Sequence, residues 1–317
     1  MGIPLPTLAA DEIHPNAPAW FRRALAVPGT IEQVEVDGVS VEYLAWGERG
    51  RPGLVFVHGG GAHAYWWAPV AARFAGECRV AAITLSGHGD SGRREVYTLE
   101  SWTDEVAAVI EDADMAPHPV AVGHSMGGMV SIATAARHGH RLGGVIIVDS
   151  PVDRPDPEVR SFHLREAFGK KRVYPSVDAA VARFRTIPAQ EHYLDFVLDY
   201  VARRSVRAVE GGFAWKFDDR IFEQFGTAVR SVALPYLPHI ACRVALLRSE
   251  YGLINPEIRE RMFEAMGRRT PIIELPEAGH HPMLDVPQIL VTALRALIAD
   301  WDFSIPSVVP PPPLSVD

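Results

Sequence analysis

The chain has 317 residues, 48 % of them hydrophobic and 22 % charged, which suits a globular protein with one large core and room for an inserted subdomain. Its net charge of −8 excludes a basic nucleic-acid-binding surface. No apolar run approaches the roughly 18–20 residues of a membrane span, residues 1–10 lack a signal-peptide pattern, and two cysteines cannot form a disulfide framework, so we expect a cytoplasmic protein without a membrane or nucleic-acid partner.

The first elements differ from those that follow them. Residues 1–29 carry scattered prolines and apolar residues, and we expect an N-terminal arm that lies over the core. Thr30–Val36 and Val39–Ala45 are extended runs on either side of Asp37-Gly38. Because Asp-Gly supplies the positive φ angles of a tight turn, these two runs are predicted to form an antiparallel hairpin.

After the hairpin, short apolar runs alternate with helical patterns. The expected strands are Leu54–Val57, Val80–Leu85, Val120–Val122, Val145–Val148, Val244–Leu247 and Ile272–Leu275. The expected helices are Thr98–Ala113, Met126–His138, Pro256–Met266 and Pro287–Ala299. Strands that are apolar throughout are typical of a sheet covered by helices on both faces. The alternation predicts an α/β fold with a mostly parallel, doubly wound sheet of about eight strands.

One long interval breaks this alternation. Residues 151–236 contain helical patterns, many aromatic residues and no convincing buried strand, and this is too long for a loop. We therefore expect a helical cap over the carboxyl edge of a core made of residues 30–150 and 237–303. Residues 304–317 are predicted to be a proline-rich tail.

A candidate nucleophile lies between an expected strand and an expected helix. Gly123-His124-Ser125-Met126-Gly127 has the Gly-x-Ser-x-Gly pattern of a nucleophile elbow. Such a turn lifts the serine hydroxyl clear of the sheet and leaves little space for side chains at the two glycines. It also points the amide of Met126, at the start of a helix, toward a developing negative charge.

Together with three further motifs, this elbow resembles the α/β-hydrolase family over about residues 30–300. His58-Gly59-Gly60-Gly61 looks like the family's oxyanion loop, Ser86 to Ser91 resembles its Gly-x-Gly-x-Ser turn, and Gly279-His280 resembles its catalytic-histidine loop. The resemblance implies a hydrolase in which Ser125 is the nucleophile and His280 the base, while the amides of Gly60 and Met126 form the oxyanion hole. Residues expected at the substrate pocket are His58, Gly59, Gly61, His124, Trp66 and Trp67. Neither a metal nor a cofactor is expected.

The third member of the triad is less obvious. Most of the family places its acid after the strand represented here by Val244–Leu247, but that position falls on Gly252. Some relatives, including certain lactonases, place the acid after the preceding strand, where this chain has Asp149. We therefore expect Asp149 to support His280, with Glu250 as the alternative.

These residues point to a serine hydrolase that cleaves a small-to-medium apolar or aromatic carboxylic ester or lactone through an acyl-enzyme. A dedicated lactonase, a monoester (monoalkyl phthalate) hydrolase, a carbon–carbon bond hydrolase and a slow ligand-binding receptor on the same fold stay open as alternatives. The sequence leaves open whether the chain is a monomer or a homodimer.

Overall fold

The computed structural model describes residues 2–152, 172–228, 233–299 and 301–304. A nine-stranded sheet forms its centre, in the order β1-β2-β3-β5-β4-β6-β7-β10-β11. These strands are β1 (Ile3–Pro4), β2 (Gly29–Val36), β3 (Val39–Trp46), β4 (Gly53–Val57), β5 (Arg79–Ile83), β6 (Val120–His124), β7 (Gly144–Val148), β10 (Arg243–Tyr251) and β11 (Ile272–Gly279). The predicted hairpin is present as β2 and β3, and every pairing from β5 to β11 is parallel.

Each central strand is buried on both faces, as its apolar sequence predicted. In β4, Leu54 and Phe56 pack into one hydrophobic cluster, whereas Val55 and Val57 pack into the other. Alternate side chains of a strand point to opposite faces, so one strand contributes to two cores. The predicted α/β architecture with a doubly wound sheet is confirmed.

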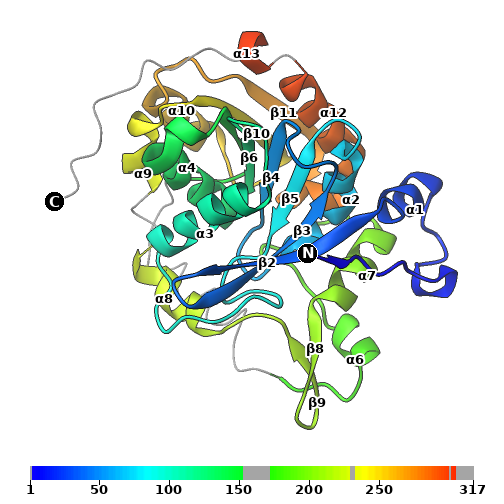
Figure 1. Cartoon of the computed structure of the whole chain (residues 1–317). Coiled ribbons are helices and arrows are strands. Elements are labelled where there is room, and N and C mark those ends of the chain that lie inside the picture. The colour runs from blue at the N-terminus through cyan, green and yellow to red at the C-terminus, as the bar shows by residue number, and fades with distance from the viewer. Residues whose placement is uncertain (1, 153–171, 229–232, 300, 305–317) are drawn as a thin grey trace.

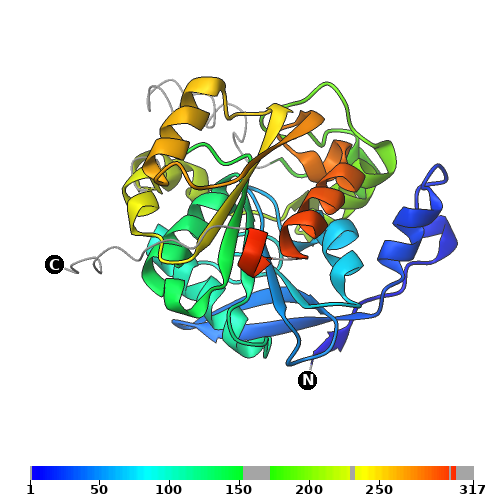
Figure 2. The same cartoon turned by 90° about the horizontal axis from the view of Figure 1, so that it is seen from above.

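Helices cover both faces of the sheet, which Figure 2 shows from above. One face carries α1 (Ala19–Leu25), α2 (Ala68–Ala71), α7 (Asp195–Arg204) and α12 (Pro287–Ile298). The other carries α3 (Leu99–Asp112), α4 (Met126–His138), α9 (Ala233–Tyr236) and α10 (Pro256–Ala265). The expected start of α10 is present: Asn255 Oδ1 accepts the Ile258 amide at 2.8 Å. None of the helices in the described ranges is long and apolar enough to cross a membrane.

The N-terminal segment contributes to the core. Strand β1 pairs antiparallel with the outer edge of β2, where Ile3 lies opposite Ile31 and Pro4 opposite Thr30. Helix α1 then packs Phe21, fully buried, into the same cluster as α2. The segment before the first long strand therefore extends the sheet and covers one of its faces.

The expectation of an entirely helical cap is wrong in one respect. Between α7 and α8 (Arg220–Ala228), strands β8 (Val206–Val209) and β9 (Gly212–Trp215) form an antiparallel hairpin. Its turn is Glu210-Gly211, in which Gly211 adopts a φ of +79° that suits glycine. Together with α6 (Val177–Val181), the hairpin projects away from the sheet (Figure 1). Residues 153–171 of the predicted cap and 305–317 of the predicted tail lie outside the described residues.

Candidate active site

The candidate residues meet at the carboxyl edge of the parallel strands. Ser125 directly follows β6, Asp149 follows β7 and His280 follows β11, while His58 follows β4. Parallel strands end at the same edge of a sheet, so residues separated by 155 positions become neighbours.

The turn at Ser125 has the strained conformation expected of a nucleophile elbow. Ser125 has φ +54° and ψ −118°, a region that residues with a Cβ seldom adopt. A Cβ at Gly123 would overlap the carbonyl oxygen of Gly127, and a Cβ at Gly127 would overlap the carbonyl oxygens of Val57 and His58. Only glycine at these two positions allows β6, α4 and the loop after β4 to pack this closely.

A chain of hydrogen bonds links the three expected triad residues. The Nε2 of His280 lies 3.0 Å from the Oγ of Ser125, and its Nδ1 lies 2.7 Å from the Oδ2 of Asp149. Because a carboxylate can only accept, Nδ1 carries the proton and the lone pair of Nε2 faces the serine hydroxyl. This tautomer can remove a proton from Ser125.

Asp149 is fully buried and held by backbone amides. Its Oδ2 accepts the amide of Leu253 at 2.8 Å, and its Oδ1 accepts the amide of Ser249 at 3.4 Å. Burial raises the pKa of Asp149 to about 6, although these amides oppose the shift. A Cβ at Gly252, the position where most of the family has its acid, would overlap the Asp149 carboxylate. The carboxylate of Asp149 thus occupies the space that an acid at position 252 would take.

Glu250, the alternative acid, has a different partner. Its Oε2 accepts the amide of Glu277 at 2.9 Å in an exposed setting at the end of β10. The carboxylate that contacts the His280 ring is therefore that of Asp149.

The expected oxyanion donors lie next to the nucleophile. Met126 is the first residue of α4, so its amide has no acceptor within the helix. Gly60 is exposed and Ser125 is partly exposed, whereas Gly59 and Met126 are buried. A substrate approaching from solvent can therefore reach the serine hydroxyl and the oxyanion loop together.

The expected pocket residues divide into groups with different roles. His58 is buried and supports the oxyanion loop: its Nε2 accepts the amide of Leu85 at 3.0 Å, and its Nδ1 donates to the carbonyl of Gly59 at 2.7 Å. His124 contacts the loop that carries His280, because its Nε2 donates to the His280 carbonyl at 2.7 Å. Burial lowers the pKa of His124 to about 4, so its ring is neutral at pH 7.

The glycines of this loop provide space and curvature. A Cβ at Gly59 would lie 3.1 Å from the Nδ1 of His124 and 3.3 Å from the Cβ of Ser125. Gly61 adopts a φ of +74°, which turns the chain toward the following 3-10 helix.

The two adjacent tryptophans have different aromatic neighbours. Trp66 contacts Phe184 of the cap and His281, with ring centroids 6.0 and 5.5 Å away. Trp67 is fully buried and packs on Phe56 of β4 at 5.1 Å. Its ring also lies 6.3 Å from that of His124, and the placement of Trp67 in the substrate pocket stays a prediction.

Phe222 of α8 is a site residue that the sequence did not reveal. The edge of its ring lies 3.7 Å from where a Cβ of Gly60 would be, and the Sδ of Met126 lies 3.8 Å from the same point. The oxyanion loop is thus bordered by two apolar side chains. The aromatic content of the cap was the only available signal, and it did not single out this residue.

Three histidines at this edge form a group that could hold a metal. His124, His280 and His281 each offer a ring nitrogen, and these atoms lie within 4.8 Å of one another. The sequence pattern did not reveal this cluster, because His124 is distant in the chain from the other two. Both nitrogens of His280 already contact Ser125 and Asp149, so a metal bound here would compete with the triad.

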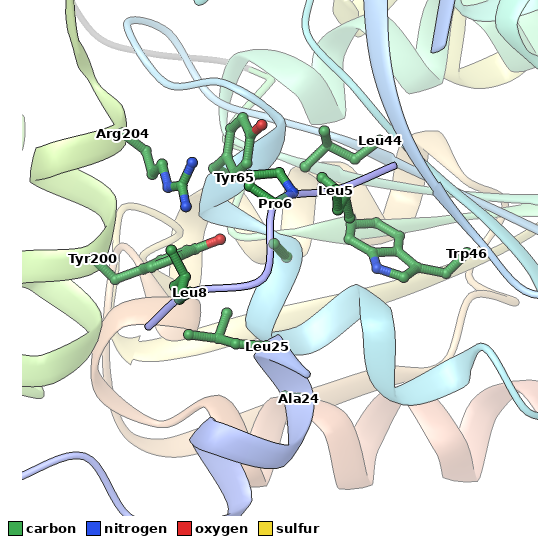
Figure 3. Close-up of a pocket in the computed structure, with 11 residues that line it drawn as sticks. Leu5, Pro6, Leu8, Ala24, Leu25, Leu44, Trp46, Tyr65, Tyr200 and Arg204 are labelled. Atoms are coloured by element: carbon green, nitrogen blue, oxygen red, sulfur yellow. The ribbon is translucent and has the colours of Figure 1, made fainter. Parts of the chain in front are cut away.

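A separate recess lies between the N-terminal segment and α7 (Figure 3). Its walls include Leu5, Leu44 and Trp46, and the rings of Tyr65 and Tyr200 flank the guanidinium of Arg204 at 5.1 and 5.7 Å. The recess has room for a few water molecules but not for an ester. This recess is lined by none of the triad residues and does not serve the chemistry.

Comparison with known proteins finds similar sequences along most of the chain. A family model described as "Alpha/beta hydrolase family" matches residues 54–293. Esterase Rv0045c of Mycobacterium tuberculosis is 24 % identical over 86 % of this chain and 91 % of its own. The 2-(acetamidomethylene)succinate hydrolase of Mesorhizobium japonicum is 23 % identical over 79 % of this chain and 90 % of its own.

Solved structures show the same fold. E-2-(acetamidomethylene)succinate hydrolase superposes with a TM-score of 0.75 at 20 % identity, covering 86 % of this chain and 99 % of that one. The thioesterase domain from the curacin biosynthetic pathway gives 0.70 at 23 % identity, covering 84 % and 99 %.

Proposed function

Since the chain belongs to the α/β-hydrolase family and is a hydrolase, we propose that it is a serine hydrolase acting on carboxylic esters or lactones. The observation that carries this proposal is the unbroken contact from the Oγ of Ser125 through His280 to Asp149, with Ser125 partly exposed to solvent. A serine hydroxyl needs an adjacent base to become a nucleophile at neutral pH, and this arrangement supplies one.

The proposed reaction has two stages. In the first, His280 takes the hydroxyl proton while the Oγ of Ser125 attacks the substrate carbonyl, and the amides of Gly60 and Met126 stabilise the oxyanion. His280 then protonates the leaving alkoxide, which leaves an acyl group on Ser125. In the second stage His280 activates water, which releases the acid, while Asp149 stabilises the imidazolium in both stages.

The surroundings of the nucleophile favour an apolar or aromatic substrate of small to medium size. Phe222 and the Met126 side chain border the oxyanion loop, and Trp66 with Phe184 extends the apolar surface toward the cap. The esterase relative matches along most of its length, which supports an ester as the substrate. A lactone is a cyclic ester and uses the same groups.

A turnover screen tests the proposal. Purified wild-type protein and Ser125→Ala are assayed against p-nitrophenyl acetate and butyrate, aliphatic lactones and aromatic monoesters, and Ser125 is tested with a fluorophosphonate that labels activated serines. We expect turnover and labelling by the wild type and neither by Ser125→Ala. Tight ligand binding without turnover and without labelling would instead identify a receptor and refute the proposal.

A further inference from the structure

A loop of the cap lies directly on the loop that carries His280. It spans residues 186–194, between α6 and α7, and its central residue is Gln190. The Oε1 of Gln190 accepts the amide of His281 at 2.9 Å, and its Nε2 donates to the Oδ2 of Asp285 at 2.8 Å. That same carboxylate oxygen accepts the amide of Gly279 at 2.6 Å. The residues immediately before and after His280 are therefore both tied to the Gln190–Asp285 pair.

Close packing supports these hydrogen bonds. A Cβ at Gly279 would lie 2.8 Å from the Cδ of Gln190, so the glutamine side chain rests directly on the backbone before His280. The ring of His281 contacts the same loop from the other side, since its Nε2 lies 3.3 Å from the Pro188 carbonyl. The amide of Leu194 donates to the carbonyl of Leu284 at 2.9 Å, which fixes the far end of the loop.

The cap loop is itself braced by a directed chain of hydrogen bonds. The Oγ1 of Thr186 donates to the Pro188 carbonyl at 2.9 Å, so at its 2.6 Å contact with Tyr193 it accepts the phenolic proton. The Tyr193 oxygen in turn accepts the amide of Gln190 at 2.9 Å. This chain holds the backbone of Gln190 in place, so the side chain does not have to order the loop by itself.

We propose that Gln190 is a positioning residue that sets His280 in line with Ser125, so that the cap completes the catalytic geometry. This inference rests on the proposed serine hydrolase function. His280 must meet Ser125 and Asp149 with opposite edges of one ring, which requires its backbone to be fixed on both sides. Misplacement of a catalytic group by about 1 Å can reduce the rate about a hundredfold.

Gln224 provides a matched control elsewhere on the cap. It is also a glutamine that ties the cap to the core: its Oε1 accepts the amide of Tyr97 at 2.8 Å, and its Nε2 donates to the carbonyl of Glu95 at 2.9 Å. These bonds reach the loop before α3 and not the His280 loop. Replacement by alanine removes hydrogen bonds between cap and core at either site, with the same residue type.

The experiment compares Gln190→Ala with Gln224→Ala in the full-length protein. For Gln190→Ala we expect kcat to fall about 10- to 100-fold with KM changed less than about threefold, because Gln190 orients the base and does not touch the substrate. The fluorophosphonate labelling rate of Ser125 should fall by a similar factor. Gln224→Ala should keep kcat within about twofold, while both variants lose a similar few degrees in Tm.

A rescue separates positioning from general loosening. Gln190→Glu keeps the acceptor for the His281 amide but sets a carboxylate against Asp285. We expect a loss of kcat that adding Asp285→Asn reverses only in part, since the new amide nitrogen can donate to the glutamate but no longer accepts the amide of Gly279. Should Gln190→Ala fail to fold, Gln190→Glu and its rescue give the same readout.

The possible outcomes are distinguishable. An unreactive Ser125 in the wild type refutes the proposed function and this inference with it. A reactive Ser125 that is labelled equally fast in wild type and Gln190→Ala refutes the role of Gln190 alone. Equal losses of kcat in Gln190→Ala and Gln224→Ala also refute it, because they would reflect cap attachment in general.

Discussion

Replacing Asp149 with asparagine should damage catalysis while improving stability. Asparagine has nearly the same shape, but it has no charge to stabilise the imidazolium of His280, which the aspartate contacts at 2.7 Å. In a serine protease triad the same substitution lowers kcat about 10⁴-fold, and we expect a loss of about 10³- to 10⁴-fold here. Glu250→Gln, whose carboxylate binds the Glu277 amide, should stay within about twofold of the wild type.

The expected gain in stability follows from the burial of this carboxyl. Burial raises the pKa of Asp149 from 3.8 to about 6 in the folded protein, so the ionised form is destabilised there. The pKa of Asp149 is higher in the folded protein than in the unfolded chain. Its ionisation therefore lowers the free energy of unfolding as the pH rises from about 4 to about 6, and the loss stays constant above that pH. The full loss in the free energy of unfolding is about 3 kcal/mol, and Asp149→Asn removes it. Weaker hydrogen bonding by asparagine offsets about 1 kcal/mol of this gain.

Urea unfolding at pH 5 and at pH 8, with ester turnover measured at pH 8, checks both effects of this substitution. We expect Asp149→Asn to gain about 1–2 kcal/mol over the wild type at pH 8 and less at pH 5. An Asp149→Asn enzyme that keeps more than a tenth of the wild-type kcat would refute the assignment of the acid. The electrostatic reasoning would be refuted if the stability difference between Asp149→Asn and wild type were less favourable to the variant at pH 8 than at pH 5.

Further substitutions test the rest of the site. Ser125→Ala should reduce kcat at least about a thousandfold with Tm nearly unchanged, as measured by turnover and thermal unfolding. Gly252→Asp should by itself be inactive, because its Cβ overlaps the Asp149 carboxylate. Asp149→Gly combined with Gly252→Asp should be more active than Asp149→Gly alone. Equal activities of these two variants would contradict the view that an acid at position 252 can replace Asp149. Phe222→Ala should raise KM for p-nitrophenyl butyrate more than for the acetate, because it removes apolar surface beside Gly60. Micromolar Zn²⁺ should inhibit turnover reversibly, less so in His281→Ala, and inhibition that is equal in both proteins would place the metal elsewhere.

The sequence predicted the parts of the site that depend on local pattern. Each motif directly follows a buried parallel strand, and strand direction alone brings Ser125, Asp149 and His280 to one edge. Asp149 could be proposed because the usual acid position holds Gly252, and the overlap of that glycine with the carboxylate gives the physical reason.

What the sequence did not reveal depends on tertiary contacts without a residue pattern. Gln190 binds a backbone amide 91 positions away, and no motif is needed for a side chain to meet an amide. Trp66 and Trp67 are chemically identical in the sequence, yet Trp66 contacts Phe184 and Trp67 contacts Phe56. The β8–β9 hairpin was missed because short strands outside the sheet lack the continuous apolar run of the buried ones.

The chain order of the proposed triad affects when activity can arise during synthesis. Ser125 and Asp149 directly follow the neighbouring strands β6 and β7, which α4 joins, so one local unit of the chain carries both. Their proposed base, His280, is made later, because it follows β11, which pairs with β10 at the edge of the sheet. A chain synthesised only as far as β10 therefore holds the proposed nucleophile without its base, and under the proposed function activity requires β11 to dock beside β10.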